Sequence, residues 1–125
     1  MSEPKRILLI KPSAQGDIVH ALPIATLLKR RWPRARLSWL VNSGFAEIVE
    51  RHAAVDEAIH FDRRRIGSFT PGSGPIARVT ELAEQLAARQ FDMAIDLQGL
   101  ARSAVLTLAS LAPVRVGFGY ARELA

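Results

Sequence analysis

Cysteine is absent from this sequence of 125 residues, and long apolar runs are absent as well. Without cysteine, neither a disulfide nor a thiolate metal site can form. The longest apolar candidate, residues 104–113, contains Thr107 and Ser110 and is much shorter than the about 20 residues that span a bilayer. The first apolar run, Ile7 to Ile10, is too short for the core of a secretory signal. We therefore expect a protein without disulfides or membrane spans, peripheral to a membrane at most.

Aromatic residues are scarce, at 6% of the chain, whereas basic residues are plentiful. Lysine and arginine number 17 against 12 acidic residues, and the net charge of +5 favours an anionic partner, although a basic solvated surface explains it equally well. With few aromatic side chains to stack on bases and no recognisable reading helix, we expect no nucleic-acid partner. Basic residues gather near the end of one predicted helix, which favours an anionic membrane surface: Lys29, Arg30, Arg31, Arg34 and Arg36.

Apolar periodicity predicts five strands that alternate with helices. The strands are expected at residues 6–11, 37–41, 58–61, 93–95 and 114–118, and the helices at residues 21–32, 45–52, 75–89 and 102–111. Pro23 should either kink the first helix or mark its first turn. Because 49% of the residues are apolar and the length suits one domain, the alternation predicts an α/β fold with a parallel sheet flanked by helices.

The stretch from Lys11 to His20 follows the first predicted strand and leads into the first predicted helix. This order places Asp17 near a helix N-terminus at the carboxyl edge of the sheet, where open α/β sheets bind ligands. One interpretation is structural: Gly16 makes the turn, and Asp17 caps the helix because free backbone N–H groups stabilise a carboxylate there. The other is a general base that accepts a proton from a sugar hydroxyl. His20, one turn further on, would face the same cleft.

Two other segments contain candidate binding residues. The triplet Arg63 to Arg65 opens a glycine-rich loop, and arginine suits bidentate phosphate binding, but such a triplet is also typical of a solvated loop. Asp96 and Gln98 follow the fourth predicted strand, and the sequence alone favours local caps of an ordinary strand–helix turn there.

Two other patterns point away from function. The histidines are far apart and have no metal-ligand spacing, so His52 and His60 are interpreted as structural or surface residues. The Gly-x-Gly at residues 117–119 follows the last strand and lacks the third glycine of a dinucleotide fingerprint. We expect neither a metal nor a cofactor.

Several of these segments resemble the glycosyltransferases of family 9, which move ADP-heptose onto lipopolysaccharide. The similar segments are SAQGDIVHALP at residues 13–23, FAEI at 45–48, HAAV at 52–55, DLQGL at 96–100 and ARE at 121–123. The DLQGL segment is similar to the first type of heptosyltransferase and differs from the second.

The resemblance implies a Rossmann-like fold, that of the N-terminal acceptor domain of a GT-B glycosyltransferase, and assigns Asp17 as the catalytic base. It also implies acceptor-binding roles for Ser13, Gly16, His20, Arg64, Arg65, Asp96, Gln98, Gly99 and Arg122. The segment at residues 62–74 is richer in glycine than the corresponding family segment.

The resemblance further implies that residues 1–125 form a single acceptor-binding domain, with the C-terminal nucleotide-sugar domain outside this chain, so that the chain alone is inactive. The whole enzyme would be an inverting ADP-heptose:lipopolysaccharide heptosyltransferase that transfers heptose to Kdo of the lipid A inner core. Its partners would be a Kdo–lipid A acceptor, ADP-heptose and the inner-membrane surface, on the cytoplasmic side. Two alternatives are a stand-alone α/β module that binds an anionic glycan or phospholipid, and a family-9 transferase of different sugar specificity.

Overall fold

The computed structural model describes residues 3–12, 15–61, 75–98 and 106–117. The strands lie within one residue of the bounds expected at either end. A short helical segment also covers residues 106–109. The elements are, in chain order, β1 (Arg6–Ile10), α1 (Gln15–Arg31), β2 (Arg36–Asn42), the 3-10 helix η1 (Ser43–Phe45), α2 (Ala46–Glu50), β3 (Glu57–Phe61), α4 (Pro75–Ala88), β4 (Met93–Asp96) and β5 (Val114–Gly117).

The five strands form one sheet in the order β3-β2-β1-β4-β5, and every pairing is parallel. In the middle of the sheet, Ile7 pairs with Leu37 of β2 on one side and with Met93 of β4 on the other. The strand order therefore reverses at β1, with the next two strands of the chain on one side and the last two on the other. The predicted parallel sheet flanked by helices is confirmed.

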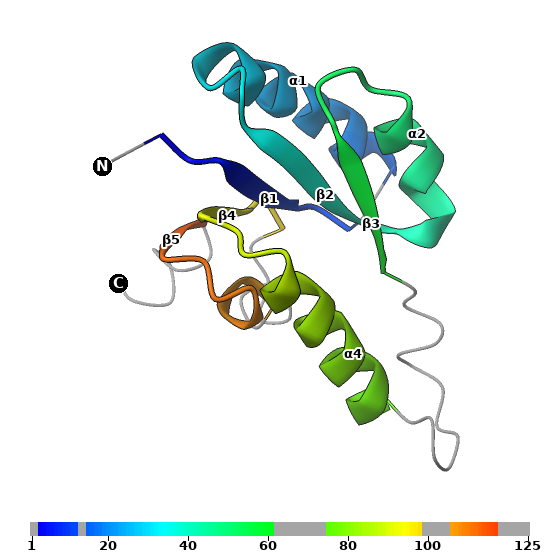
Figure 1. The fold of residues 1–125 in the computed structure, drawn as a ribbon. Coiled ribbons are helices and arrows are strands. Elements are labelled where there is room, and N and C mark those ends of the chain that lie inside the picture. The colour runs from blue at the N-terminus through cyan, green and yellow to red at the C-terminus, as the bar shows by residue number, and fades with distance from the viewer. Residues whose placement is uncertain (1–2, 13–14, 62–74, 99–105, 118–125) are drawn as a thin grey trace, which may run out of the picture.

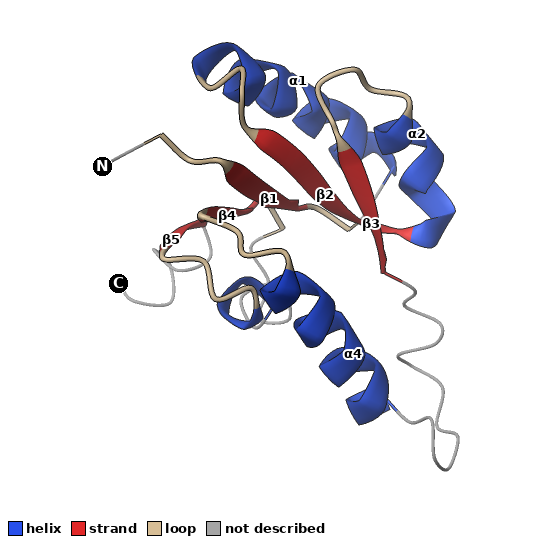
Figure 2. Ribbon diagram, viewed as in Figure 1, coloured by secondary structure: helices blue, strands red, loops and turns tan. Residues whose placement is uncertain are grey.

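Helices cover both faces of the sheet. Figures 1 and 2 show α1 and α2 on one face and α4 on the opposite face. Successive residues of β1 point to opposite faces, and they divide the core accordingly. The cluster under α1 and α2 includes Ile7, Leu9, Ile18, Ala25, Leu37, Trp39, Val41 and Val49. The cluster under α4 and the segment 106–109 includes Leu8, Ile10, Leu40, Ile59, Leu82, Leu86 and Leu106. Strands buried on both faces explain the continuous apolar runs in the sequence.

Helix α1 begins six residues earlier than expected, at Gln15 rather than Ala21. Pro23 lies inside it, so this proline does not mark the first turn. A proline deprives the carbonyl four residues earlier, here that of Val19, of its helical N–H partner. Val19 and Pro23 are both exposed, so water can hydrate the freed carbonyl. The exposed position explains why the helix tolerates this residue.

Helix α1 has a buried side and an exposed side. Ile18, Ala21 and Ala25 are buried against the sheet, whereas Leu27 is 60% exposed. Within the described ranges, no helix is both long enough and apolar enough to cross a bilayer.

Candidate active site

The reversal of strand order makes the junction of β1 and β4 the topological switch point of the sheet. After β1 the chain enters α1 on one face, whereas the segment 106–109 that follows β4 packs with α4 on the other face. In open parallel sheets, ligands bind outside the carboxyl ends of the strands at such a switch point. Ile10 and Asp96, the last residues of the two strands, are paired in register there.

The exit of β1 is held by neighbouring strands. The indole N–H of Trp39 donates to the carbonyl of Lys11 at 3.1 Å, and the N–H of Asn42 donates to the carbonyl of Pro12 at 3.0 Å. On the other side, the N–H of Leu97 donates to the carbonyl of Ile10 at 3.0 Å. Because these bonds fix the backbone just before α1, they set where the first turn of that helix lies.

Asp17 lies in that first turn, as expected. Its side chain is 65% exposed, and one carboxylate oxygen lies 4.0 Å from Nζ of Lys11, whose own side chain is only 12% exposed. A carboxylate in the first turn of a helix is stabilised by the helix dipole. The geometry thus presents an accessible carboxylate, which suits a group that must meet the proton of a bound hydroxyl.

Gly16 does not form a turn before the helix, which corrects the structural interpretation above, because it is the second residue of α1. A Cβ added at Gly16 would meet nothing within 4 Å. The protein itself therefore leaves room for a larger side chain at this exposed position. His20 is also exposed, one turn beyond Asp17, and residues three apart on a helix lie on the same side.

Asp96 and Gln98 lie at the end of β4, beside β1. Asp96 is only 1% exposed, and its Oδ1 accepts the backbone N–H of Gln98 at 2.9 Å, as in a local cap. Gln98 is half-buried, and among the described residues no donor lies within hydrogen-bonding distance of its buried Oε1. An unsatisfied buried acceptor costs about 1–3 kcal/mol, so a ligand hydroxyl that reached Oε1 would recover free energy.

The remaining predicted site residues, Ser13, Arg64, Arg65, Gly99 and Arg122, lie outside the described residues. The structure therefore places Gly16, Asp17 and His20 near the start of α1, and Asp96 and Gln98 at the end of β4, at the same edge of the sheet.

The other two histidines have local partners, as interpreted from the sequence. Nδ1 of His52 accepts the N–H of Ala54 at 3.2 Å, and Nε2 of His60 lies 2.8 Å from a carboxylate oxygen of Glu50. At the start of η1, Oδ1 of Asn42 accepts the N–H of Gly44 at 3.0 Å and caps that turn.

Sequence reasoning did not single out Lys11 as a site residue or Trp39 as its support. The position of Lys11, directly after an apolar strand and six residues before Asp17, was the available signal. The indole bond was not predictable, because Trp39 lies on another strand.

A parallel sheet of order 3-2-1-4-5 with helices on both faces (Figure 1) defines a Rossmann-like domain, and its switch point presents an accessible carboxylate. The family model described as glycosyltransferase family 9 (heptosyltransferase) matches residues 79–125. The lipopolysaccharide heptosyltransferase 1 of Salmonella typhimurium is 37% identical over 101 residues, which are 81% of this chain and 32% of that protein. By this match, residues 79–125 belong to glycosyltransferase family 9, and the similarity to a heptosyltransferase covers 81% of the chain.

Two solved structures of a heptosyltransferase from E. coli, named WaaC, are also similar. The structure with ADP has a TM-score of 0.70 and 34% identity, and the match covers 90% of this chain and 34% of that one. The structure with ADP-2-deoxy-2-fluoro heptose has a TM-score of 0.71 and 31% identity, and the match covers 90% and 42%. The Rossmann-like fold expected for a GT-B glycosyltransferase is confirmed, and the chain spans about a third of the length of the curated relatives it matches.

Proposed function

We propose that this chain forms the N-terminal, acceptor-binding domain of an inverting ADP-heptose:lipopolysaccharide heptosyltransferase. The observation that carries the proposal is the exposed carboxylate of Asp17 in the first turn of α1, at the switch point of the sheet. Family membership supports transfer of a heptose, since a relative is a lipopolysaccharide heptosyltransferase 1. The similar structure that contains an ADP-heptose analogue supports a nucleotide-sugar donor.

In the proposed reaction, Asp17 acts as the general base. Its carboxylate takes the proton from an acceptor hydroxyl while that oxygen attacks C1 of the heptose from the side opposite the diphosphate. The new oxygen–carbon bond forms as the bond between C1 and the diphosphate breaks, so ADP leaves with the electron pair and the configuration at C1 inverts. In the complete enzyme, a second domain outside this chain is expected to bind the ADP group of the donor.

The acceptor is proposed to be Kdo of the lipid A inner core, at the cytoplasmic face of the inner membrane. Oε1 of Gln98, the buried acceptor without a described partner, would accept a hydrogen bond from a sugar hydroxyl. His20 and Gly16 would line the approach to Asp17, since both are exposed on the same turn region of α1. Asp96 would act chiefly through Gln98, whose backbone N–H it accepts. Ser13, Arg64, Arg65, Gly99 and Arg122 complete the proposed acceptor site on the family resemblance alone.

The test is heptose transfer by the complete protein that contains this chain, with Asp17→Asn compared to the unsubstituted protein. Loss of a general base lowers turnover by about 10²–10⁴-fold. Because Asp17 is exposed, the amide variant should remain folded, which circular dichroism would verify. Turnover within a few-fold of the original would rule out the base assignment.

A further inference from the structure

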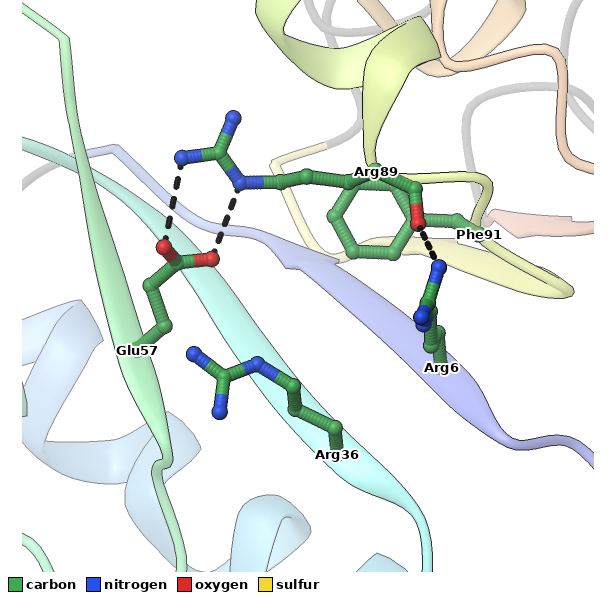
Figure 3. Close-up of a pocket in the computed structure, with 5 residues that line it drawn as sticks. All are labelled: Arg6, Arg36, Glu57, Arg89 and Phe91. Atoms are coloured by element: carbon green, nitrogen blue, oxygen red, sulfur yellow. Dashed lines mark hydrogen bonds and ion pairs between the residues drawn. The ribbon is translucent and has the colours of Figure 1, made fainter.

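A second group of charged residues lies at the opposite, amino edge of the sheet. Arg6, Arg36 and Glu57 are the first residues of β1, β2 and β3, and Arg89 and Phe91 lie between α4 and β4. These five residues line a pocket of about 360 Å³, drawn in Figure 3. None of them belongs to the proposed transfer site at the carboxyl edge.

One ion pair forms a fixed wall of this pocket. Nε and Nη2 of Arg89 donate to the two carboxylate oxygens of Glu57 at 2.9 and 3.2 Å, and Ser38 Oγ donates to the same carboxylate at 3.2 Å. Nη1 of Arg89 donates to the carbonyl of Gln85 at 2.8 Å, in the last turn of α4. Three of the five N–H groups of Arg89 and both carboxylate oxygens of Glu57 are therefore engaged with each other and with the protein.

The other two arginines retain free donors. Arg6 and Arg36 are cross-strand partners, so their side chains leave the same face of the sheet from strands about 4.8 Å apart. Nη1 of Arg6 donates to the carbonyl of Arg89 at 3.0 Å. Within the described ranges, the guanidinium of Arg36 makes neither a hydrogen bond nor an ion pair, and in Figure 3 no dashed line reaches it. Both residues are exposed.

The charges around the pocket do not cancel. Three arginines against one glutamate leave two positive charges in excess. The neighbouring carboxylates have other partners. The carboxylate of Asp92 accepts the backbone N–H groups of Lys5 and Arg6 at 2.7 and 2.9 Å. The carboxylate of Asp56 pairs with Lys29. Arg6 and Arg36 are the groups left to meet a ligand.

We propose that Arg6 and Arg36 form a binding site for a phosphate monoester at the amino edge of the sheet. A phosphate monoester carries a charge of about −1.5 to −2 at neutral pH, which matches the excess of positive charge in the pocket. Guanidinium forks donate pairs of parallel N–H bonds to phosphate oxygens, and two forks on adjacent strands can address one tetrahedral group. The Glu57–Arg89 pair forms one wall of the site, and Glu57 is paired with Arg89 rather than with Arg6 or Arg36.

The experiment titrates the full chain with inorganic phosphate and phenyl phosphate while NMR follows the arginine side-chain Nε–H signals. Vesicles of phosphatidylcholine, with and without phosphatidic acid, distinguish a membrane source of the group from a free one. We expect saturable shifts at Arg6 and Arg36 with both small phosphates. Arg36→Gln should weaken binding at least about tenfold, the effect of losing charge-assisted hydrogen bonds. The control is Arg34→Gln, which removes the same charge from an exposed arginine that does not line the pocket; it should change affinity less than about twofold, because Arg34 can act only through a charge that salt screens.

Binding of the small phosphates alone would assign a free phosphate ligand, and additional binding to vesicles that contain phosphatidic acid would assign a membrane phosphate; both support the site. Shifts that do not saturate, or vesicle binding without binding of the small phosphates, would overturn it. An equal loss of affinity in the Arg34 and Arg36 variants would also overturn it, because general attraction to a basic surface would then suffice. None of these outcomes depends on heptose transfer, so the site can fail while the proposed function stands.

Discussion

The carboxylates at the two edges of this sheet differ in how far the protein itself occupies their oxygens. At the amino edge, the carboxylate of Asp92 accepts two backbone N–H groups, that of Asp56 pairs with Lys29, and that of Glu57 pairs with Arg89. At the carboxyl edge, the carboxylate of Asp17 is 65% exposed and lies 4.0 Å from the Lys11 ammonium, and the buried Oε1 of Gln98 has no hydrogen-bond partner among the described residues.

The carboxylates at the amino edge stabilise the fold, whereas the polar groups at the carboxyl edge are those that we propose to meet a ligand. A carboxylate whose oxygens are filled by the protein stabilises the folded state but has little capacity for new partners. An accessible carboxylate adds little to stability, because exposed ion pairs contribute about 0–1 kcal/mol, and remains available for a proton. The comparison predicts that substitutions at the amino edge lower stability, whereas substitutions at the carboxyl edge lower transfer.

Glu57→Gln should give the largest change in stability. It leaves Arg89, whose side chain is 31% exposed, without its paired partner and weakens the bond to Ser38. We expect the free energy of unfolding to fall by about 1–2 kcal/mol, measured by urea denaturation at neutral pH. The matched control is Glu47→Gln, which breaks an exposed pair with Arg51 and should cost less than about 0.5 kcal/mol. Equal losses in the two variants would remove the distinction between the amino edge and ordinary surface.

Acid should lower the free energy of unfolding through two of the same carboxylates, those of Glu57 and Asp56. Hydrogen bonds and charge from Arg89 lower the pKa of Glu57 although burial opposes them. Burial acts to raise the pKa of Asp56, but the hydrogen bonds from Lys29 and the Leu37 N–H and the charges of Lys29 and Arg36 outweigh it, so that pKa is lowered too.

Groups with lowered pKa values stabilise the fold above their ordinary pKa values, 4.5 for glutamate and 3.8 for aspartate, and this contribution is lost as the pH falls through the folded-state values. The free energy of unfolding should therefore decrease below about pH 4.5, with a smaller decrease in Glu57→Gln. Urea denaturation at stepped pH would measure it; an identical acid slope in both proteins would contradict the assignment to Glu57.

Gln98→Met sharpens the comparison from the carboxyl edge. The substitution removes the buried oxygen that lacks a described partner, so the free energy of unfolding should stay the same or rise by up to about 1 kcal/mol. The KM for the acceptor should rise about tenfold, because a hydroxyl of the acceptor loses its hydrogen bond. Denaturation together with acceptor kinetics checks both effects. A destabilised variant with unchanged KM would identify Gln98 as a purely structural residue.

Gly16→Ala has the smallest expected effect on the fold. Alanine is favoured over glycine within a helix by about 0.5–1 kcal/mol, and the added Cβ would meet nothing within 4 Å. Thermal unfolding should therefore show equal or slightly higher stability. Any rise in KM for the acceptor would then report contact between this position and the bound sugar, and an unchanged KM would remove Gly16 from the acceptor site.

Much of the fold could be predicted from the sequence, because strands buried on both faces leave continuous apolar runs such as Ile7 to Ile10. The start of α1 was missed because residues 15–20 mix polar and apolar side chains and Pro23 suggested a boundary. The position of Asp17 near a helix N-terminus could be predicted, because the strand, the turn and the helix follow one another closely in the sequence.

The amino-edge pocket could not be predicted in this way. Arg6, Arg36, Glu57 and Arg89 come from four distant parts of the chain, and only the parallel pairing of the strands brings them together. The basic residues near the end of α1 looked like one cluster in the sequence. In the structure, Lys29 forms an ion pair with Asp56, and the guanidinium of Arg31 lies over the ring of Trp32. Arg36 lines the amino-edge pocket. The burial of Asp96 likewise depends on β1, which packs beside it.

The most direct measurement compares kcat and the free energy of unfolding, in the complete protein, for Asp17→Asn and Glu57→Gln side by side. We predict that Asp17→Asn lowers kcat by about 10²–10⁴-fold with little change in stability, while Glu57→Gln lowers stability and leaves kcat within a few-fold. An Asp17→Asn variant that transfers heptose at a normal rate, or a Glu57→Gln variant that is stable but inactive, would contradict it.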